Sequence, residues 1–147
     1  LVIQLFGVLF FASGVPLSAR LAERGRRPML MLVNIGMVLF GLVMAPLFEA
    51  GTAGVVAMMA SGFLLVGLAY GPIGTVLAEL FPTAVRYTGS SLTYNLAGIF
   101  GASLAPYIAT WLATTRGLAW VGYYLAACAL VSLGGLIVTH ETRDTTL

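Results

Sequence analysis

Long uncharged runs separated by short polar segments form the main pattern of this chain. The runs are Leu1–Ala19, Pro28–Phe48, Ala50–Ala78, Tyr87–Thr115 and Gly117–Thr139. A helix of about 20 residues crosses a hydrocarbon core of about 30 Å, so each run is long enough, or nearly so, to span a bilayer. The alternating pattern of a barrel strand is absent. We therefore predict an all-α membrane protein with five transmembrane helices, at about 1–19, 28–48, 54–78, 88–114 and 118–139.

Composition points to the same class of protein. The chain is 60% hydrophobic and 8% charged, with a mean hydropathy of +1.02. A soluble domain carries about 25% charged residues and could not cover its surface with so few. The single cysteine, Cys128, lies inside the fifth run, so it can form neither a disulfide within the chain nor a cysteine-based metal cluster. We expect no metal, no cofactor and no nucleic-acid partner, and membrane lipid around the helices.

The first apolar run begins at Leu1, with no polar segment before it in this sequence. It has neither the charged leader region nor the cleavage site of a signal peptide. We expect residues 1–147 to be the C-terminal portion of a longer membrane protein, with the missing N-terminal half of the same chain as its partner.

Charge places the loops relative to the membrane. All seven basic residues are arginines, and six share one side because loops alternate sides: Arg20, Arg24, Arg26, Arg27, Arg86 and Arg143. Cytoplasmic loops carry an excess of basic residues. We predict a multi-pass protein of the plasma (inner) membrane, with its N-terminal end outside and its C-terminal tail in the cytoplasm.

Glycine and polar side chains set the third and fourth runs apart from the others. Gly67 and Gly71 form a GxxxG pair, which permits close helix packing, and Pro72 permits a bend. In the fourth run, small or polar residues recur at helical spacing and form one face: Ser91, Asn95, Gly98, Ala102 and Ala105. An asparagine in lipid requires a partner on another helix or a wet cavity, and both interpretations stay open for Asn95. Gln4 in the first run presents the same choice.

The stretch AELFPTAVRYTG, Ala78 to Gly89, joins the third and fourth runs. We expect Pro82 to end the preceding helix and Thr83 to cap the next one. Glu79 and Arg86 flank this turn, on the same membrane side as the arginines of the first loop. These charges form either a cluster that closes in one conformation and opens in another, or unconnected groups at the level of the lipid headgroups.

Two segments carry a resemblance to a known family. ELFPTAVRYTGSSLTYNLAGIFGASLAPYIATWL, from Glu79 to Leu112, resembles the tenth and eleventh helices of the major facilitator superfamily, and more narrowly its metabolite:proton symporter group. PLSARLAERGRRP, from Pro16 to Pro28, resembles the loop between helices eight and nine, with Glu23 where that family usually has aspartate. The resemblance covers essentially the whole chain, as helices eight to twelve of twelve.

The resemblance implies a function and a set of site residues. It implies a secondary active transporter that moves a small polar metabolite, such as an organic acid or an osmoprotectant, together with a proton by alternating access. The first, third and fourth runs would line the central cavity, with Gln4, Tyr70, Tyr94 and Asn95 as candidate cavity residues. The implied cytoplasmic gating network contains six charged residues: Glu23, Arg24, Arg26, Arg27, Glu79 and Arg86. No acidic residue lies in the middle of a run, so we expect the proton-carrying carboxylate outside this chain.

Three other interpretations remain. One is a sugar-porter-like carrier of the same superfamily, and another is a non-transporting five-helix protein with a structural role. The third, an enzyme, is disfavoured because no H-E-x-x-H, G-x-S-x-G or phosphate-binding loop is present and the polar residues do not converge on a nucleophile. We predict no catalytic residue.

Overall fold

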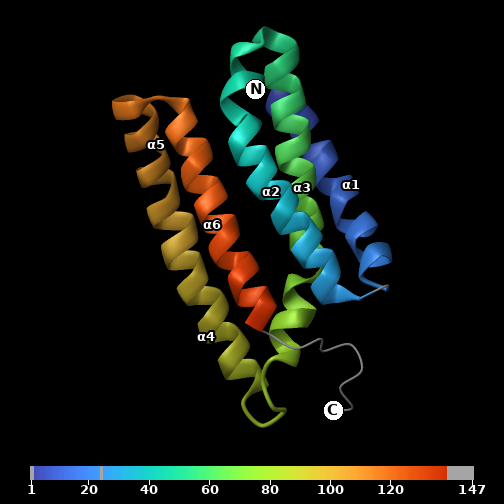
Figure 1. Ribbon diagram of the computed structural model, residues 1–147. Helices are drawn as coiled ribbons and strands as arrows, with labels where there is room; N and C mark the ends of the chain where they lie inside the picture. The colour runs from blue at the N-terminus through green and yellow to red at the C-terminus, as the bar shows by residue number, and fades with distance from the viewer. Residues whose placement is uncertain (1, 24, 139–147) are drawn as a thin grey trace.

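The fold is a bundle of membrane-length helices, here described from a computed structural model that defines residues 2–23 and 25–138. Five helices are long and apolar enough to cross a membrane, which confirms the predicted all-α fold. In chain order the elements are α1 (Val2–Ala22), α2 (Arg26–Glu49), α3 (Gly51–Glu79), α4 (Arg86–Gly98), the π-helix η1 (Ile99–Leu104), α5 (Ala105–Arg116) and α6 (Leu118–Val138) (Figure 1). The segments α4, η1 and α5 follow one another without a break and together make the fourth span.

The two ends of the bundle differ in charge. We call the end that holds the α1–α2 turn and the α3–α4 turn the basic end, because Arg26, Arg27 and Arg86 lie there. At the opposite end, a single residue separates α2 from α3 and another separates α5 from α6. Gly51 and Gly117 lie at these two turns with φ of 78° and 92°, a conformation that residues with a Cβ rarely adopt. The turns therefore leave no room for a further domain between these helices.

Helices α1 and α3 pack closely through small residues. A Cβ at Gly67 would overlap the carbonyl oxygen of Phe11, and one at Gly71 would overlap the hydroxyl of Ser18. Ser18 is completely buried and donates a hydrogen bond of 2.6 Å to the carbonyl of Val15. The GxxxG pair of α3 is therefore a packing surface for α1.

Helices α2 and α6 meet through a second pair of glycines. A Cβ at Gly41 or at Gly122 would overlap the carbonyl oxygen of the other glycine. Helix α2 also packs against α3, so it lies between α3 and α6. Apart from Pro72 of α3, the buried apolar side chains of the described residues come from α2 and α6: Met29, Leu30, Val33, Met44, Ala126 and Ala129. These two helices form the centre of the described bundle.

Two local features of the α3–α4 region differ from simple sequence rules. Helix α3 remains one continuous helix through Pro72 and ends at Glu79. The N-cap of α4 is Val85, without a side-chain capping bond, so the prediction that Thr83 caps this helix is wrong. The physical reason is a turn stabilised by its own backbone, in which the N–H of Val85 donates to the carbonyl of Pro82 at 3.0 Å. This turn delays the start of α4 beyond the reach of Thr83.

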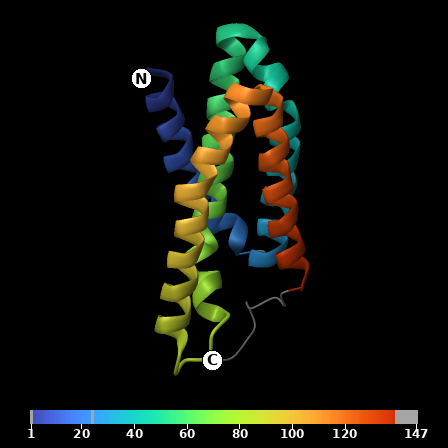
Figure 2. The same ribbon diagram turned by 90° about the vertical axis from the view of Figure 1, so that its left-hand side faces the viewer.

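The fourth span lies at one edge of the bundle, at the left in Figure 1 and nearest the viewer in Figure 2. Its first segment, α4, packs on α3, whereas its last segment, α5, packs on α6. None of residues 86–116, all of which the structure describes, is buried. The π-helix interrupts the α-helical spacing of the small and polar positions that begin at Ser91 and Asn95, so they do not continue as one straight face.

Candidate functional site

A polar pocket of about 630 Å³ lies at the basic end, between α3 and α4. Helix α3 contributes mainly small and aliphatic side chains, and α4 contributes hydroxyl, amide and guanidinium groups. The lining residues are Gly74, Leu77, Ala78, Thr83, Arg86, Tyr87, Ser90, Ser91, Tyr94 and Asn95. Two of the four candidate cavity residues, Tyr94 and Asn95, are therefore in one wall of the same pocket.

Tyr70 on α3 does not line this pocket but contacts Tyr94, which does. Its hydroxyl lies 3.0 Å from the hydroxyl of Tyr94, so the two tyrosines share one hydrogen bond between α3 and α4. The ring of Phe11 on α1 packs edge-on against Tyr70, with ring centroids 5.8 Å apart. Phe11 thus supports the ring of Tyr70 on the α1 side, and the hydroxyl of Tyr70 faces the fourth span.

The amide nitrogen of Asn95 finds its hydrogen-bond partner within its own helix. Its amide nitrogen donates to the carbonyl of Ser91 at 2.7 Å and lies 3.4 Å from the hydroxyl of Ser91. Within the described residues nothing donates to its amide oxygen, and no other helix bonds to it. Asn95 therefore lines the pocket and offers an acceptor there.

Gln4 lies apart from this pocket. It lines a separate cavity of about 230 Å³ between α1 and α3, together with Val8, Met59 and Phe63 among others. The side chain of Gln4 is exposed. The structure therefore brings together three of the four candidate cavity residues, Tyr70, Tyr94 and Asn95, and leaves the fourth elsewhere.

Adjacent arginines at the start of α2 bind two different helices. Arg26 forms an ion pair with Glu79 at the end of α3, and their side chains are only 28% and 16% exposed. Arg27 donates to the carbonyl oxygens of Leu136 at 2.9 Å and Ile137 at 2.7 Å, near the end of α6. The last carbonyls of a helix lack intrahelical partners, so a guanidinium there completes the helix end. Together the two arginines link α2 to the ends of both of its neighbours.

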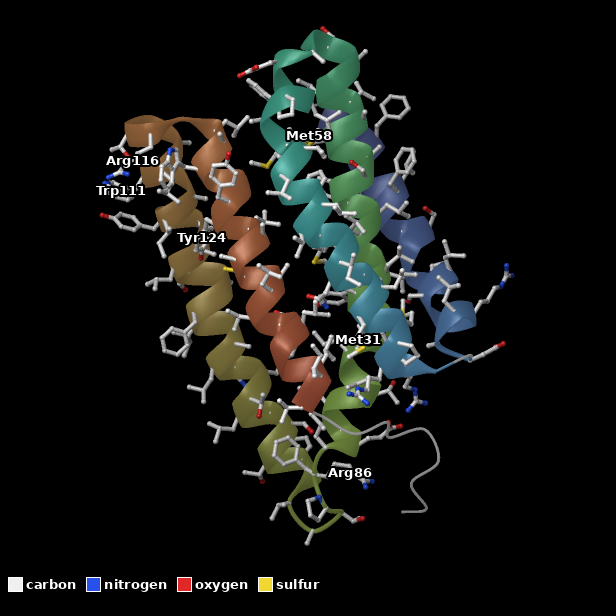
Figure 3. The ribbon with its side chains drawn as sticks, viewed as in Figure 1. Met31, Met58, Arg86, Trp111, Arg116 and Tyr124 are labelled. Carbon is white, nitrogen blue, oxygen red and sulfur yellow. The ribbon has the colours of Figure 1, made fainter. Side chains whose placement is uncertain are left out.

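Arg86 turns back toward its own loop (Figure 3). It lies 3.4 Å from the carbonyl of Phe81 and 3.5 Å from the hydroxyl of Thr83, and it also lines the polar pocket. These contacts are long for hydrogen bonds, so they bind the guanidinium weakly. Within the described residues no carboxylate pairs with Arg86.

The two remaining charges of the implied gating network are Glu23 and Arg24. Glu23 is exposed and makes no ion pair within the described residues, and Arg24 lies outside the described residues. Four of the six charges thus divide into the Arg26–Glu79 ion pair, the contact of Arg27 with the end of α6, and Arg86 in the pocket wall. A gating role for these charges stays a prediction.

The pocket also contains residues that the sequence analysis did not single out. Tyr87 and Ser90 lie in its wall beside Ser91 and Tyr94. These four positions follow the spacing i, i+3, i+4 and i+7, which places them on one face of a helix. A search for hydroxyl side chains at that spacing would have found this wall.

Comparison with known proteins defines the class of protein. The sequence model of the family described as "Sugar (and other) transporter" matches residues 1–147. The chain belongs to this transporter family, and with it to the major facilitator superfamily, which confirms the membership predicted from its motifs. With five apolar helices and this membership, it is a multi-pass membrane protein.

Individual relatives narrow the similarity. The inner membrane metabolite transport protein YhjE of Escherichia coli (strain K12) is 47% identical over 97% of this chain and 33% of its own length. The proline/betaine transporter of the same organism is 27% identical over 95% of this chain and 28% of its own length. The glycine betaine/proline/ectoine/pipecolic acid transporter OusA of Dickeya dadantii is also 27% identical, with the same coverage. The chain thus spans about a third of the length of these relatives, and no solved structure matches it significantly.

Proposed function

We propose that these helices are the C-terminal part of a proton-coupled carrier for a small polar metabolite, and that the pocket between α3 and α4 is part of its substrate path. The names of the relatives support the substrate class, since they include a metabolite transport protein and carriers of proline and betaine. The chain covers about a third of those proteins. The remaining walls of the path would come from the rest of the protein, which we propose contains an N-terminal half.

The observation that carries this proposal is a wall of hydrogen-bonding groups in an otherwise apolar bundle. A polar solute leaving water needs replacement partners, because an unsatisfied polar group in an apolar setting costs roughly 1–3 kcal/mol. The pocket offers the hydroxyls of Ser91 and Tyr94, the amide of Asn95 and the guanidinium of Arg86. No acidic side chain lines it within the described residues. This set suits a solute that carries hydroxyl or carboxylate groups.

The ion pair beside the pocket supports a gating role at the same end. Glu79 directly follows Leu77 and Ala78, which line the pocket, so its bond to Arg26 positions that wall. When the pair opens, the end of α3 is released from α2, and the pocket can change shape. We propose that the pair closes and opens within each transport cycle and that the basic end faces the cytoplasm.

Proton coupling would depend on a group outside this chain. The described acidic residues, Glu23, Glu49 and Glu79, all lie at helix ends or turns. We therefore propose that the proton-carrying carboxylate belongs to the remainder of the protein.

Uptake by the full-length protein in proteoliposomes tests the proposal. The panel contains proline, glycine betaine, small hydroxy- and keto-carboxylates and hexoses, each with and without an imposed pH gradient. We expect uptake of one of the first three classes, at least fivefold faster with an inward proton gradient and lost with a protonophore. Uptake of hexoses alone would favour the sugar-porter alternative that the family description leaves open. Failure of every compound to enter would favour a non-transporting role.

Replacement of Glu79 by glutamine tests the gate. Removal of the carboxylate leaves Arg26 without this partner and releases the end of α3. We expect Glu79→Gln to lower the maximal uptake rate about tenfold, equivalent to ~1.4 kcal/mol, with substrate affinity changed less than threefold. Glu49→Gln, an exposed site at the opposite end, is the matched control and should retain normal uptake. Normal turnover in Glu79→Gln would show that the ion pair is not a gate.

A further inference from the structure

The fourth span changes its helical winding at its midpoint. Residues Ile99–Leu104 form a π-helix between two α-helical segments. Pro106 follows, near the start of α5. A proline has no N–H, and its ring conflicts with the carbonyl four residues earlier, here that of Ala102. The wider π turn relieves this conflict, and such turns are often found at functional sites.

The two sides of this π-helix pack on different helices. We call α4 (Arg86–Gly98) the Tyr94 arm and α5 (Ala105–Arg116) the Trp111 arm. Among the described elements, the Tyr94 arm packs on α3 and the Trp111 arm on α6, apart from their contacts with η1. Within the described residues η1 makes no close backbone contact with another helix, and it faces α6 across a cavity of about 670 Å³ lined by Phe100, Leu104 and Tyr124 among others. A Cβ added at Gly98 or Gly101 would meet open space. In the part of the protein that the structure describes, the two arms therefore pack on different helices and η1 between them is loosely packed.

Few polar contacts connect the Tyr94 arm to α3. One is the hydrogen bond of 3.0 Å between the hydroxyls of Tyr70 and Tyr94. The other joins the hydroxyl of Ser90 to the carbonyl of Leu77 at 3.4 Å, which is long. A typical hydrogen bond contributes about 1 kcal/mol, so these contacts can break without loss of the fold.

We propose that η1 is a hinge on which the Tyr94 arm moves toward and away from α3, with the Tyr70–Tyr94 hydrogen bond as its latch. This proposal rests on the proposed function of the pocket, because the arm carries the pocket wall with Ser91, Tyr94 and Asn95. Movement of the arm changes the width of the pocket, while the Trp111 arm stays on α6. A solute that bonds either tyrosine hydroxyl competes with the latch and so couples occupancy to the position of the arm.

Distances between spin labels test the hinge directly. The full-length protein, with its native cysteines changed to serine, is reconstituted in lipid nanodiscs and labelled at two pairs of introduced cysteines. One pair, Thr88 and Leu32, reports on the Tyr94 arm, and the matched pair, Ala113 and Leu42, reports on the Trp111 arm. All four positions are exposed, and both pairs use α2 as the reference. We expect the distance distribution of the first pair to contain two separate populations, and that of the second pair to contain one narrow population.

Two variants complete the test. Pro106→Ala restores the backbone N–H and permits α-helical winding at this position. We therefore expect the distance distribution of the first pair to contain a single population in this variant. Tyr94→Phe removes the latch and should raise the population of the longer distance several-fold. A single distance for the first pair in both the parent and Tyr94→Phe would overturn the hinge, as would equal broadening of both pairs. These measurements need no substrate, so failure of the uptake assays would leave their outcome unaffected.

Discussion

Arg26, Arg27 and Arg86 illustrate how residues of one type differ by their partners. Arg26 binds a carboxylate, Arg27 binds the last carbonyls of α6, and Arg86 lies in the pocket wall with only long contacts to its own turn. A guanidinium with weak contacts can exchange them for a ligand at little cost. Among these arginines, Arg86 is therefore the one whose charge is most available to a solute in the pocket.

The Tyr70–Tyr94 pair gives a prediction at the scale of single residues. Tyr94→Phe keeps the ring and removes one hydroxyl of the pair. Loss of one hydrogen bond to the solute is equivalent to about 0.5–1.5 kcal/mol, so we expect the KM for uptake to rise by a factor between about 2 and 13. Protein level in the membrane should stay unchanged.

Tyr107→Phe provides the matched control for this substitution. Tyr107 lies in the same span, outside the polar pocket, and is 73% exposed. Its loss of a hydroxyl should leave the KM within twofold of the parent protein. An equal rise in KM for both variants would mean that the effect of Tyr94→Phe does not come from the pocket.

At the scale of helices, glycine determines which elements approach closely. The pairs α1–α3 and α2–α6 both cross where a Cβ would overlap a backbone carbonyl. In lipid the hydrophobic effect does not favour one helix pair over another, so close van der Waals packing selects the partners. The fourth span has no such crossing within the described residues, and it lies at the edge.

Gly67 gives a prediction at this scale. The Cβ of Gly67→Ala would meet the backbone of Phe11, which cannot move as a side chain can. We expect this variant to lose about 1–3 kcal/mol of stability, as overpacked cores do, and to melt at a lower temperature in detergent. Gly74→Ala in the same helix places its Cβ in open space and should melt at or above the parent temperature. If both variants melt alike, the close contact of α1 with α3 does not stabilise the bundle.

At the scale of the whole molecule, charge and polarity concentrate at one end. The basic end holds the ion pair, the polar pocket and the described arginines apart from Arg116, which lies with Trp120 at the opposite end. The Arg116 guanidinium lies 5.1 Å from the ring centre of Trp120, an arrangement suited to a membrane interface. This asymmetry supports the proposed orientation, with the basic end in the cytoplasm.

Cysteine labelling in intact cells tests this orientation. The full-length protein, with native cysteines changed to serine, receives either Thr83→Cys in the α3–α4 turn or Ala50→Cys in the α2–α3 turn. Both positions are exposed. We expect a membrane-impermeant maleimide to label the cysteine at position 50 in intact cells and the one at position 83 only after the membrane is opened. The reverse pattern would place the basic end outside.

The sequence alone determined the class of protein, the number of spans and the membership in its family. Each uncharged run is long enough to cross a bilayer, and in lipid a run must satisfy its own backbone hydrogen bonds, which an isolated segment can do only as a helix. This outcome depends on local composition, so it can be derived without knowledge of how the helices pack. The family membership, in contrast, was predicted from the motifs of Glu79–Leu112 and Pro16–Pro28.

The tertiary structure alone decided which faces of the helices meet. The close contacts at Gly67 and at Ser18 fix which face of α1 packs on α3. With α1 packed in this way, Gln4 lines a different cavity from Tyr94. The turn before α4 moves its start to Arg86, so Thr83 does not cap it. The π-helix depends on the balance between the ring of Pro106 and the packing of two arms on different helices. The rotation of α1 and the packing of the two arms arise from contacts between residues distant in the chain, which the pattern along a single helix does not contain. The turn before α4 instead depends on the local backbone bond from Val85 to Pro82.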